Sequence, residues 1–161
     1  MGGTSRGTFL RKRFSESMRC NGEWMSCEDG VIRPVIRAEV MTSGGAWRSL
    51  ELRVDTGADR TVICSSVLEN IHLPRLTTEN RIAGLGGIAR AVIVATTIRM
   101  FRDDGGDVIF RSDFMACIDA EALDMSVLGR DILDMFALVA DSPANVLSIL
   151  GGKHHYVVEQ R

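Results

Sequence analysis

The feature that most constrains the fold is an alternating apolar segment that ends in an aspartate. In residues 50–54, Leu-Glu-Leu-Arg-Val, apolar side chains occupy every second position, which is typical of a β-strand with one buried face. Residues 55–58, Asp-Thr-Gly-Ala, predict a tight turn, and residues 61–64, Thr-Val-Ile-Cys, predict a second short strand. A carboxylate at the end of a buried strand loses hydration, which is costly for an unpaired charge. We therefore expect Asp55 to have a chemical role.

The length of 161 residues fits one domain, which can bury roughly 70% of its unfolded surface without help from a disulfide or metal. The net charge of −2 gives no electrostatic footprint for nucleic acid. No apolar run reaches the length of a membrane-spanning helix. The basic run at residues 11–13 has no apolar segment behind it, so no secretory signal is predicted and a cytoplasmic location is expected.

The cysteines predict no metal site. Cys64 and Cys117 lie in apolar runs and are expected to be buried thiols, while Cys20 and Cys27 flank a polar segment without a nearby histidine. Neither pair has the spacing of zinc ligands. We expect no metal and no cofactor.

Composition divides the chain into three parts. Residues 1–29 are rich in Gly, Ser, Arg and Glu without hydrophobic periodicity, which predicts a mobile N-terminal extension. Residues 30–151 are expected to form the folded domain, and residues 152–161 a C-terminal tail.

Within this domain the pattern predicts mostly β-structure. A short helix is expected near residue 66, with Ser66 and Glu69 as a capping box, and another after Gly129. Strands are predicted over residues 31–40, 47–54, 88–102, 108–118, 136–140 and 146–150.

A glycine cluster lies in residues 82–87, Ile-Ala-Gly-Leu-Gly-Gly. A phosphate-binding loop needs a helix behind its glycines, so that the N–H groups and the helix dipole meet at the anion. Here a long strand follows instead. The cluster therefore predicts the mobile tip of a β-hairpin.

Three segments together resemble the retropepsin-like aspartic proteases, the family of the retroviral proteases and their cellular and bacterial relatives. Residues 54–59, Val-Asp-Thr-Gly-Ala-Asp, resemble the active-site signature. Residues 82–87 resemble the tip of the flap, the hairpin that closes over bound peptide. Residues 127–130, Val-Leu-Gly-Arg, with a helix behind them, resemble the second signature. The resemblance spans about residues 31–150 and implies an all-β closed barrel or sandwich with a flap hairpin and one or two short helices.

The resemblance also implies roles for the active-site loop. Asp55 would be catalytic, and Thr56 would bond across a symmetry axis to a second subunit. Gly57 would permit the turn, and Ala58 would line the floor of the site. Asp59 would bind the peptide backbone.

Two other segments would support that loop. Arg130 would pair with Asp59, and Gly129 would lie in the strand that packs under the loop. In the flap, Leu85 would offer its backbone N–H to a water that bridges to substrate. The implied flap residues are Ile82, Ala83, Gly84, Leu85, Gly86 and Gly87.

In this family a water held between two carboxylates hydrolyses the peptide bond, because one carboxylate must act as base while the other acts as acid. This chain has one Asp-Thr-Gly, and residues 141–143, Asp-Ser-Pro, lack the glycine that a second turn needs. A C2 homodimer with Asp55 from each subunit on the axis is therefore expected. Residues 146–150 are a candidate interface strand.

The expected function is an aspartic endopeptidase that acts on peptides or proteins. A non-catalytic peptide-binding or scaffold module on the same fold is the alternative, and a small β-domain in which Asp55 merely forms a turn is a third. The intact Asp55-Thr56-Gly57 favours the enzyme, because a simple peptide groove has little need of an acid at that position.

Overall fold

A computed structural model describes residues 18–77, 80–84 and 87–154. The predicted flap-tip residues Leu85 and Gly86 lie outside the described residues. In chain order the elements are β1 (Arg19–Asn21), β2 (Glu23–Ser26), β3 (Ile32–Met41), β4 (Trp47–Val54), β5 (Val62–Ile63), α1 (Ser65–Ile71), β6 (Asn80–Gly84), β7 (Gly87–Phe101), β8 (Asp107–Cys117), β9 (Ser126–Leu128), α2 (Arg130–Leu133), β10 (Ala137–Asp141) and β11 (Val146–Leu150).

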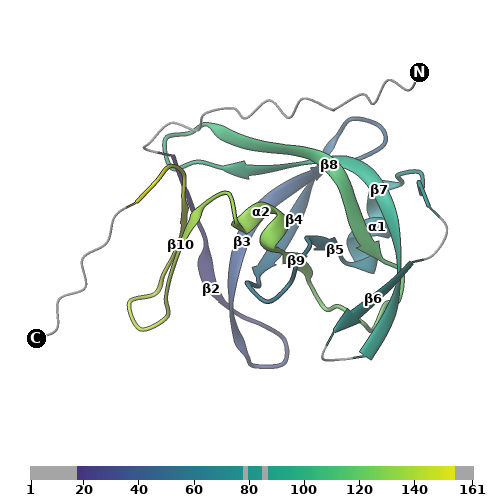
Figure 1. Cartoon of the computed structure of the whole chain (residues 1–161), viewed down its shortest axis with the longest axis horizontal. Helices are drawn as coiled ribbons and strands as arrows, with labels where there is room; N and C mark the ends of the chain where they lie inside the picture. The colour runs from purple at the N-terminus through teal and green to yellow at the C-terminus, as the bar shows by residue number, and fades with distance from the viewer. Residues whose placement is uncertain (1–17, 78–79, 85–86, 155–161) are drawn as a thin grey trace, which may run out of the picture.

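Six strands close into a barrel (Figure 1). Their order is β3-β4-β9-β5-β8-β7, and β7 returns to pair with β3, for example through Arg99 opposite Glu39. Strands β2 and β6 extend the sheet beyond β3 and β7. Closure leaves few exposed edges for unwanted pairing. The predicted all-β closed barrel with a hairpin and two short helices is confirmed.

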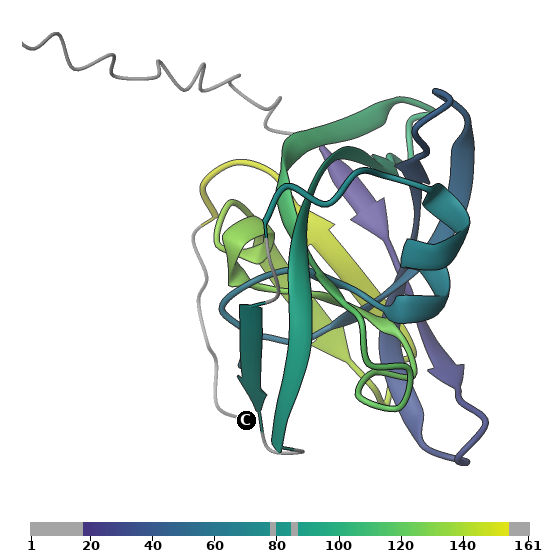
Figure 2. The same cartoon turned by 90° about the vertical axis from the view of Figure 1, so that its right-hand side faces the viewer.

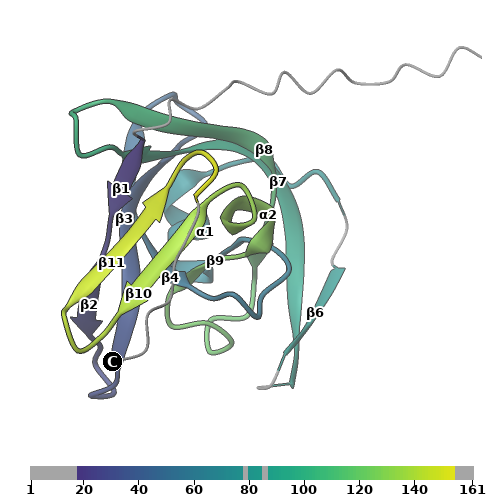
Figure 3. The ribbon, with the colours of Figure 1, turned by 60° about the vertical axis from the view of Figure 1, so that its left-hand side comes forward.

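The predicted flap corresponds to the β6–β7 hairpin. Its last described pairs are Ala83 with Ile88 and Gly84 with Gly87. Figure 2 and Figure 3 show β6 and β7 at one side of the barrel, with the last described residues of β6 at the same end of the molecule as the β2–β3 turn. The hairpin is thus placed to reach over that end.

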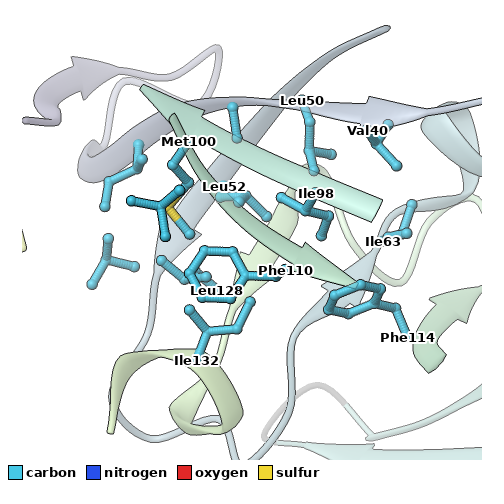
Figure 4. Close-up of a cluster of buried hydrophobic side chains, with 14 of the residues drawn as sticks. Val40, Leu50, Leu52, Ile63, Ile98, Met100, Phe110, Phe114, Leu128 and Ile132 are labelled. Atoms are coloured by element: carbon cyan, nitrogen blue, oxygen red, sulfur yellow. The ribbon is translucent and has the colours of Figure 1, made fainter. Parts of the chain in front are cut away.

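The barrel interior is filled by alternate residues of the long strands (Figure 4). Leu50 and Leu52 of β4 and Ile98 and Met100 of β7 are fully buried, as the period-two pattern of β4 predicts. Each such side chain contributes roughly 1.5–3 kcal/mol through burial. This packing fixes the end of β4, from which the Asp55 loop leaves.

The N-terminal part of the fold differs from the prediction. Residues 18–26 are not an extension: β1 pairs with β11, and β2 pairs with β3. Met18 and Cys20 are buried in the core. The assignment of residues 1–29 to a mobile segment is therefore wrong for this stretch, because its few apolar residues are buried by strands far along the chain. Residues 1–17 lie outside the described residues.

Strand β11 lies in the middle of a small sheet, between β1 and β10. Both of its edges are therefore paired within the same chain. Residues 146–150 therefore have no free edge for backbone pairing with a partner subunit, and a contribution of their side chains to an interface stays a prediction. The sequence did not reveal that β1 takes the second edge.

The first helix begins two residues earlier than the capping box predicts, because a Ser66 N-cap would make Val67 the first helical residue. Ser65 is its first residue and Cys64 its N-cap, with no side-chain cap hydrogen bond. Ser66 instead lies within 3.3 Å of the Cys64 sulfur. The helix ends at Ile71, where His72 takes a left-handed conformation. In the described chain, neither helix has the length and apolar character needed to cross a membrane.

Candidate active site

Asp55 follows β4 directly, where β4 runs parallel to β9 and Val54 lies opposite Leu128. The Asp55 backbone N–H donates to the Leu128 carbonyl at 3.1 Å, which fixes the point at which the chain leaves the sheet. The Asp55 side chain is 39% exposed in the single chain. The buried carboxylate expected from the strand pattern is therefore half-exposed, because the turn lifts it to the rim of the barrel.

Gly57 holds the Asp55 carboxylate in place. Its N–H donates to Asp55 Oδ1 at 2.9 Å, and a Cβ on Gly57 would lie 3.2 Å from the same oxygen. The Ala58 N–H donates to the Asp55 carbonyl at 3.2 Å, which closes the turn. Thr56 is exposed beside them. A short turn thus orients one carboxylate at an open surface.

The β9–α2 junction packs directly under this loop. A Cβ on Gly129 would lie 2.2 Å from the Arg60 carbonyl carbon, so only glycine fits there. The Arg130 N–H donates to the Ala58 carbonyl at 2.8 Å, and the Asp131 N–H to the Asp59 carbonyl at 3.2 Å. The two segments that carry the sequence signatures, residues 54–59 and 127–130, are therefore joined by backbone hydrogen bonds.

The pairing inferred for Arg130 is present. Its Nη1 lies 3.4 Å from Asp59 Oδ1, and its Nε lies 3.6 Å from Asp134. The Asp59 side chain is 88% exposed, so water screens this pair and its contribution to stability is small. Its exposed carboxylate leaves Asp59 accessible to a ligand.

A buried hydrogen-bond network that the sequence analysis missed supports the loop. The Thr61 N–H and hydroxyl both donate to Asp131 Oδ1, at 2.8 and 2.7 Å. The Thr61 hydroxyl accepts the Gly129 N–H at 3.1 Å, and Thr61 is fully buried. In the sequence, the only indication of this network is a threonine in an otherwise apolar strand. That pattern does not reveal which distant residues are its hydrogen-bond partners.

A row of alternating charges lies beside Asp55 and was not predicted from the sequence. Arg53 Nη2 lies 3.8 Å from Asp55 Oδ2, and Arg53 Nη1 lies 3.9 Å from Asp124 Oδ1. Arg33 lies 3.8 Å from Asp124 and forms a two-point pair with Asp29. That pair holds the pKa of the Asp29 carboxyl at about 2. The pairing of β3 with β4 ends at Val35 opposite Arg53, so the local sequence pattern gave no signal for this row of charges.

The β6–β7 hairpin is hydrogen-bonded, through Arg90 of β7, to the loop that precedes β9. Arg90 donates from its backbone N–H at 2.7 Å and from Nε at 2.9 Å to the Asp119 carboxylate. These hydrogen bonds hold the pKa of Asp119 below its usual range. Beyond this clamp, Ile82 is half-buried while Ala83 and Gly87 are exposed.

The thiols of Cys20 and Cys117 are unreactive, and the described residues do not group as a metal centre. Burial raises the pKa of Cys20 to about 11 and also raises that of Cys117, so both thiols are protonated at neutral pH. Among the residues that the structure describes, no three His, Cys, Asp or Glu side chains are grouped to hold a metal ion.

Comparison with solved structures identifies the fold as retropepsin-like. A retropepsin-like aspartic protease from Rickettsia conorii matches with a TM-score of 0.51 and 17% identity, over 83% of this chain and 89% of that one. The protease of EIAV, solved with an inhibitor, matches with a TM-score of 0.45 and 22% identity, over 63% of this chain and 86% of that one. No protein-family model matches the chain, and no curated protein matches it.

Proposed function

We propose that the protein is an aspartic endopeptidase in which Asp55 from each of two subunits forms the catalytic pair. The observation that carries the proposal is the placement of the Asp55 carboxylate. It is oriented by the Gly57 N–H, fixed to β9 and half-exposed at the rim of a retropepsin-like barrel.

The chemistry requires two carboxylates. At about 4 Å two like charges repel by roughly 4 kcal/mol at an effective dielectric near 20, so the pair shares one proton and titrates as a unit. The ionised acid takes a proton from water, and the resulting hydroxide attacks the peptide carbonyl carbon. The protonated acid gives its proton to the carbonyl oxygen. Collapse of this tetrahedral diol breaks the C–N bond: the acid that took the water proton gives it to the leaving nitrogen, and a hydroxyl of the diol returns a proton to the other carboxylate, without a covalent enzyme intermediate.

The dimer follows from the single chain's incomplete site. One Asp-Thr-Gly supplies one carboxylate, whereas a C2 axis through the loop brings in the second from the same residue of the partner. Thr56, which is exposed in the single chain, would bond across that axis, and exposed Asp59 would bind the peptide backbone. The β6–β7 hairpin would cover the bound peptide.

The decisive variant is Asp55→Asn, which keeps the shape of the side chain but cannot accept the proton of the attacking water. We expect cleavage of a mixed peptide library to fall by at least a factor of about 10³, while sedimentation still shows a dimer. Mass spectrometry of the library gives both the rate and the cleaved bonds.

Asp113→Asn is the matched control, because Asp113 is an exposed carboxylate on β8 and should leave cleavage unchanged. Peptide binding without cleavage by the unaltered protein would favour the scaffold alternative. A fully active monomer would overturn the dimeric site.

A further inference from the structure

We infer that Arg53 is a specificity-determining residue that selects substrates with an acidic side chain next to the scissile bond. The inference rests on the proposed function and deepens it. It starts from the contact between Arg53 and the proposed catalytic group: Arg53 Nη2 lies 3.8 Å from Asp55 Oδ2. A peptide bond positioned on Asp55 therefore brings its two flanking side chains close to this guanidinium.

The Arg53 guanidinium is poorly satisfied within the chain. Its two carboxylate contacts, at 3.8 Å to Asp55 and 3.9 Å to Asp124, are too long for hydrogen bonds. Among the described residues, the Arg53 guanidinium has no closer hydrogen-bond or ion-pair partner, although only 27% of the side chain is exposed. A guanidinium presents five N–H donors in a fork that matches a carboxylate. A substrate carboxylate would supply the missing acceptors.

Asp124 occupies the place that such a carboxylate would take. Its side chain is 56% exposed and lies between Arg33 and Arg53, at 3.8 and 3.9 Å. Arg33 already forms a two-point pair with Asp29, so it does not hold Asp124 by a close hydrogen bond. Asp124 is thus a loosely held internal counterion, and it can move into solvent when a ligand carboxylate arrives.

The remaining charges near Arg53 do not oppose this exchange. Glu51, two residues earlier on β4, lies 3.8 Å from Arg37 on the neighbouring strand. In the proposed dimer each Arg53 guanidinium lies beside the Asp55 of its own chain, as it does in the single chain. Once Asp124 moves into solvent, a substrate carboxylate can approach the side of Arg53 that Asp124 leaves.

The test uses two peptides that differ only by Glu or Gln next to the scissile bond of a sequence cleaved in the library experiment. We expect the unaltered protein to show a kcat/KM about tenfold higher for the Glu peptide, which corresponds to one charge-assisted pair. Arg53→Gln should bring this ratio close to one, and Arg53→Lys should retain part of it. Asp124→Asn should raise the ratio, because it removes the competing carboxylate.

Arg111→Gln is the matched control, since Arg111 is an exposed arginine on β8. It should leave the ratio unchanged. The dissociation constants of both peptides for the Asp55→Asn protein provide a readout that does not need turnover, and they should show the same preference.

The outcomes separate the two proposals. If neither peptide nor the library is cleaved, the proposed function fails. If both peptides are cleaved equally, or if Arg53→Gln keeps the preference for Glu, the inference about Arg53 is overturned while the protease remains.

Discussion

At the scale of single residues, the candidate site depends on Gly57, Thr61 and Gly129. Gly57 keeps the space beside the Asp55 carboxylate free and donates to it. Gly129 allows the second signature to approach the loop backbone within van der Waals contact. Thr61 joins the two segments through hydrogen bonds. The position of the Asp55 carboxylate is thus supported by two glycines and a threonine, with Asp131 as the acceptor for Thr61.

Thr61→Val tests this network. The variant keeps the side-chain volume but leaves the buried Gly129 N–H without its acceptor and removes one donor from Asp131. We expect the free energy of unfolding to fall by about 1–3 kcal/mol, measured by urea denaturation. Thr61→Ser, which retains the hydroxyl, should recover most of the loss. Equal stability of the Val variant and the unaltered protein would show that the network contributes little.

At the scale of elements, the chain between β1 and β2 joins the small sheet to the barrel. Gly22 lies at the junction and donates its N–H to Leu147 of β11 at 2.8 Å. A Cβ there would lie 2.4 Å from Leu147 Cδ2 and 2.6 Å from the Val35 carbonyl oxygen. The two sheets can therefore approach each other only across a residue without a side chain.

Gly22→Ala should therefore force the two sheets apart. We expect a loss of about 1–3 kcal/mol in the free energy of unfolding, the usual cost of overpacking, seen as a lower urea midpoint. Gly44→Ala is the control, because a Cβ at Gly44 has its nearest neighbour at 3.9 Å. Equal midpoints for the two variants would mean that residues 19–26 are not integral to the fold.

At the scale of the whole molecule, one chain holds half of the proposed catalytic centre. The described fold leaves Asp55, Thr56 and Asp59 open at one end, and it occupies both edges of β11. An isologous dimer must therefore use surfaces other than β11 pairing to bring the two loops together.

Mixing experiments test whether both subunits contribute. When Asp55→Asn chains are added to a fixed amount of unaltered chains and allowed to exchange, activity should fall in proportion to the unaltered fraction, because mixed dimers hold one carboxylate. Peptide cleavage after equilibration gives this dependence. The Asp113→Asn protein added in the same way should increase activity. Activity that does not change as Asp55→Asn chains are added would point to a site complete in one chain.

Local patterns were enough to predict several elements. The pattern of residues 47–54 predicted β4 with its observed bounds, and the three motifs, through their resemblance to the retropepsin-like family, predicted the loop, the hairpin and the β9–α2 junction, because each is short and contiguous. The closed barrel was implied by that resemblance and is confirmed by the strand pairing, whereas the strand pattern alone requires only that the apolar faces be buried against one another.

Contacts between different segments of the chain became visible only in the folded structure. Residues 18–26 have too weak a pattern to reveal two strands, because β11 and β3 supply their burial and hydrogen bonds. Thr61 and Asp131 lie 70 residues apart, and Arg53 and Asp124 belong to different segments of the chain. Their contacts depend on register and closure of the barrel, which a local residue pattern does not encode.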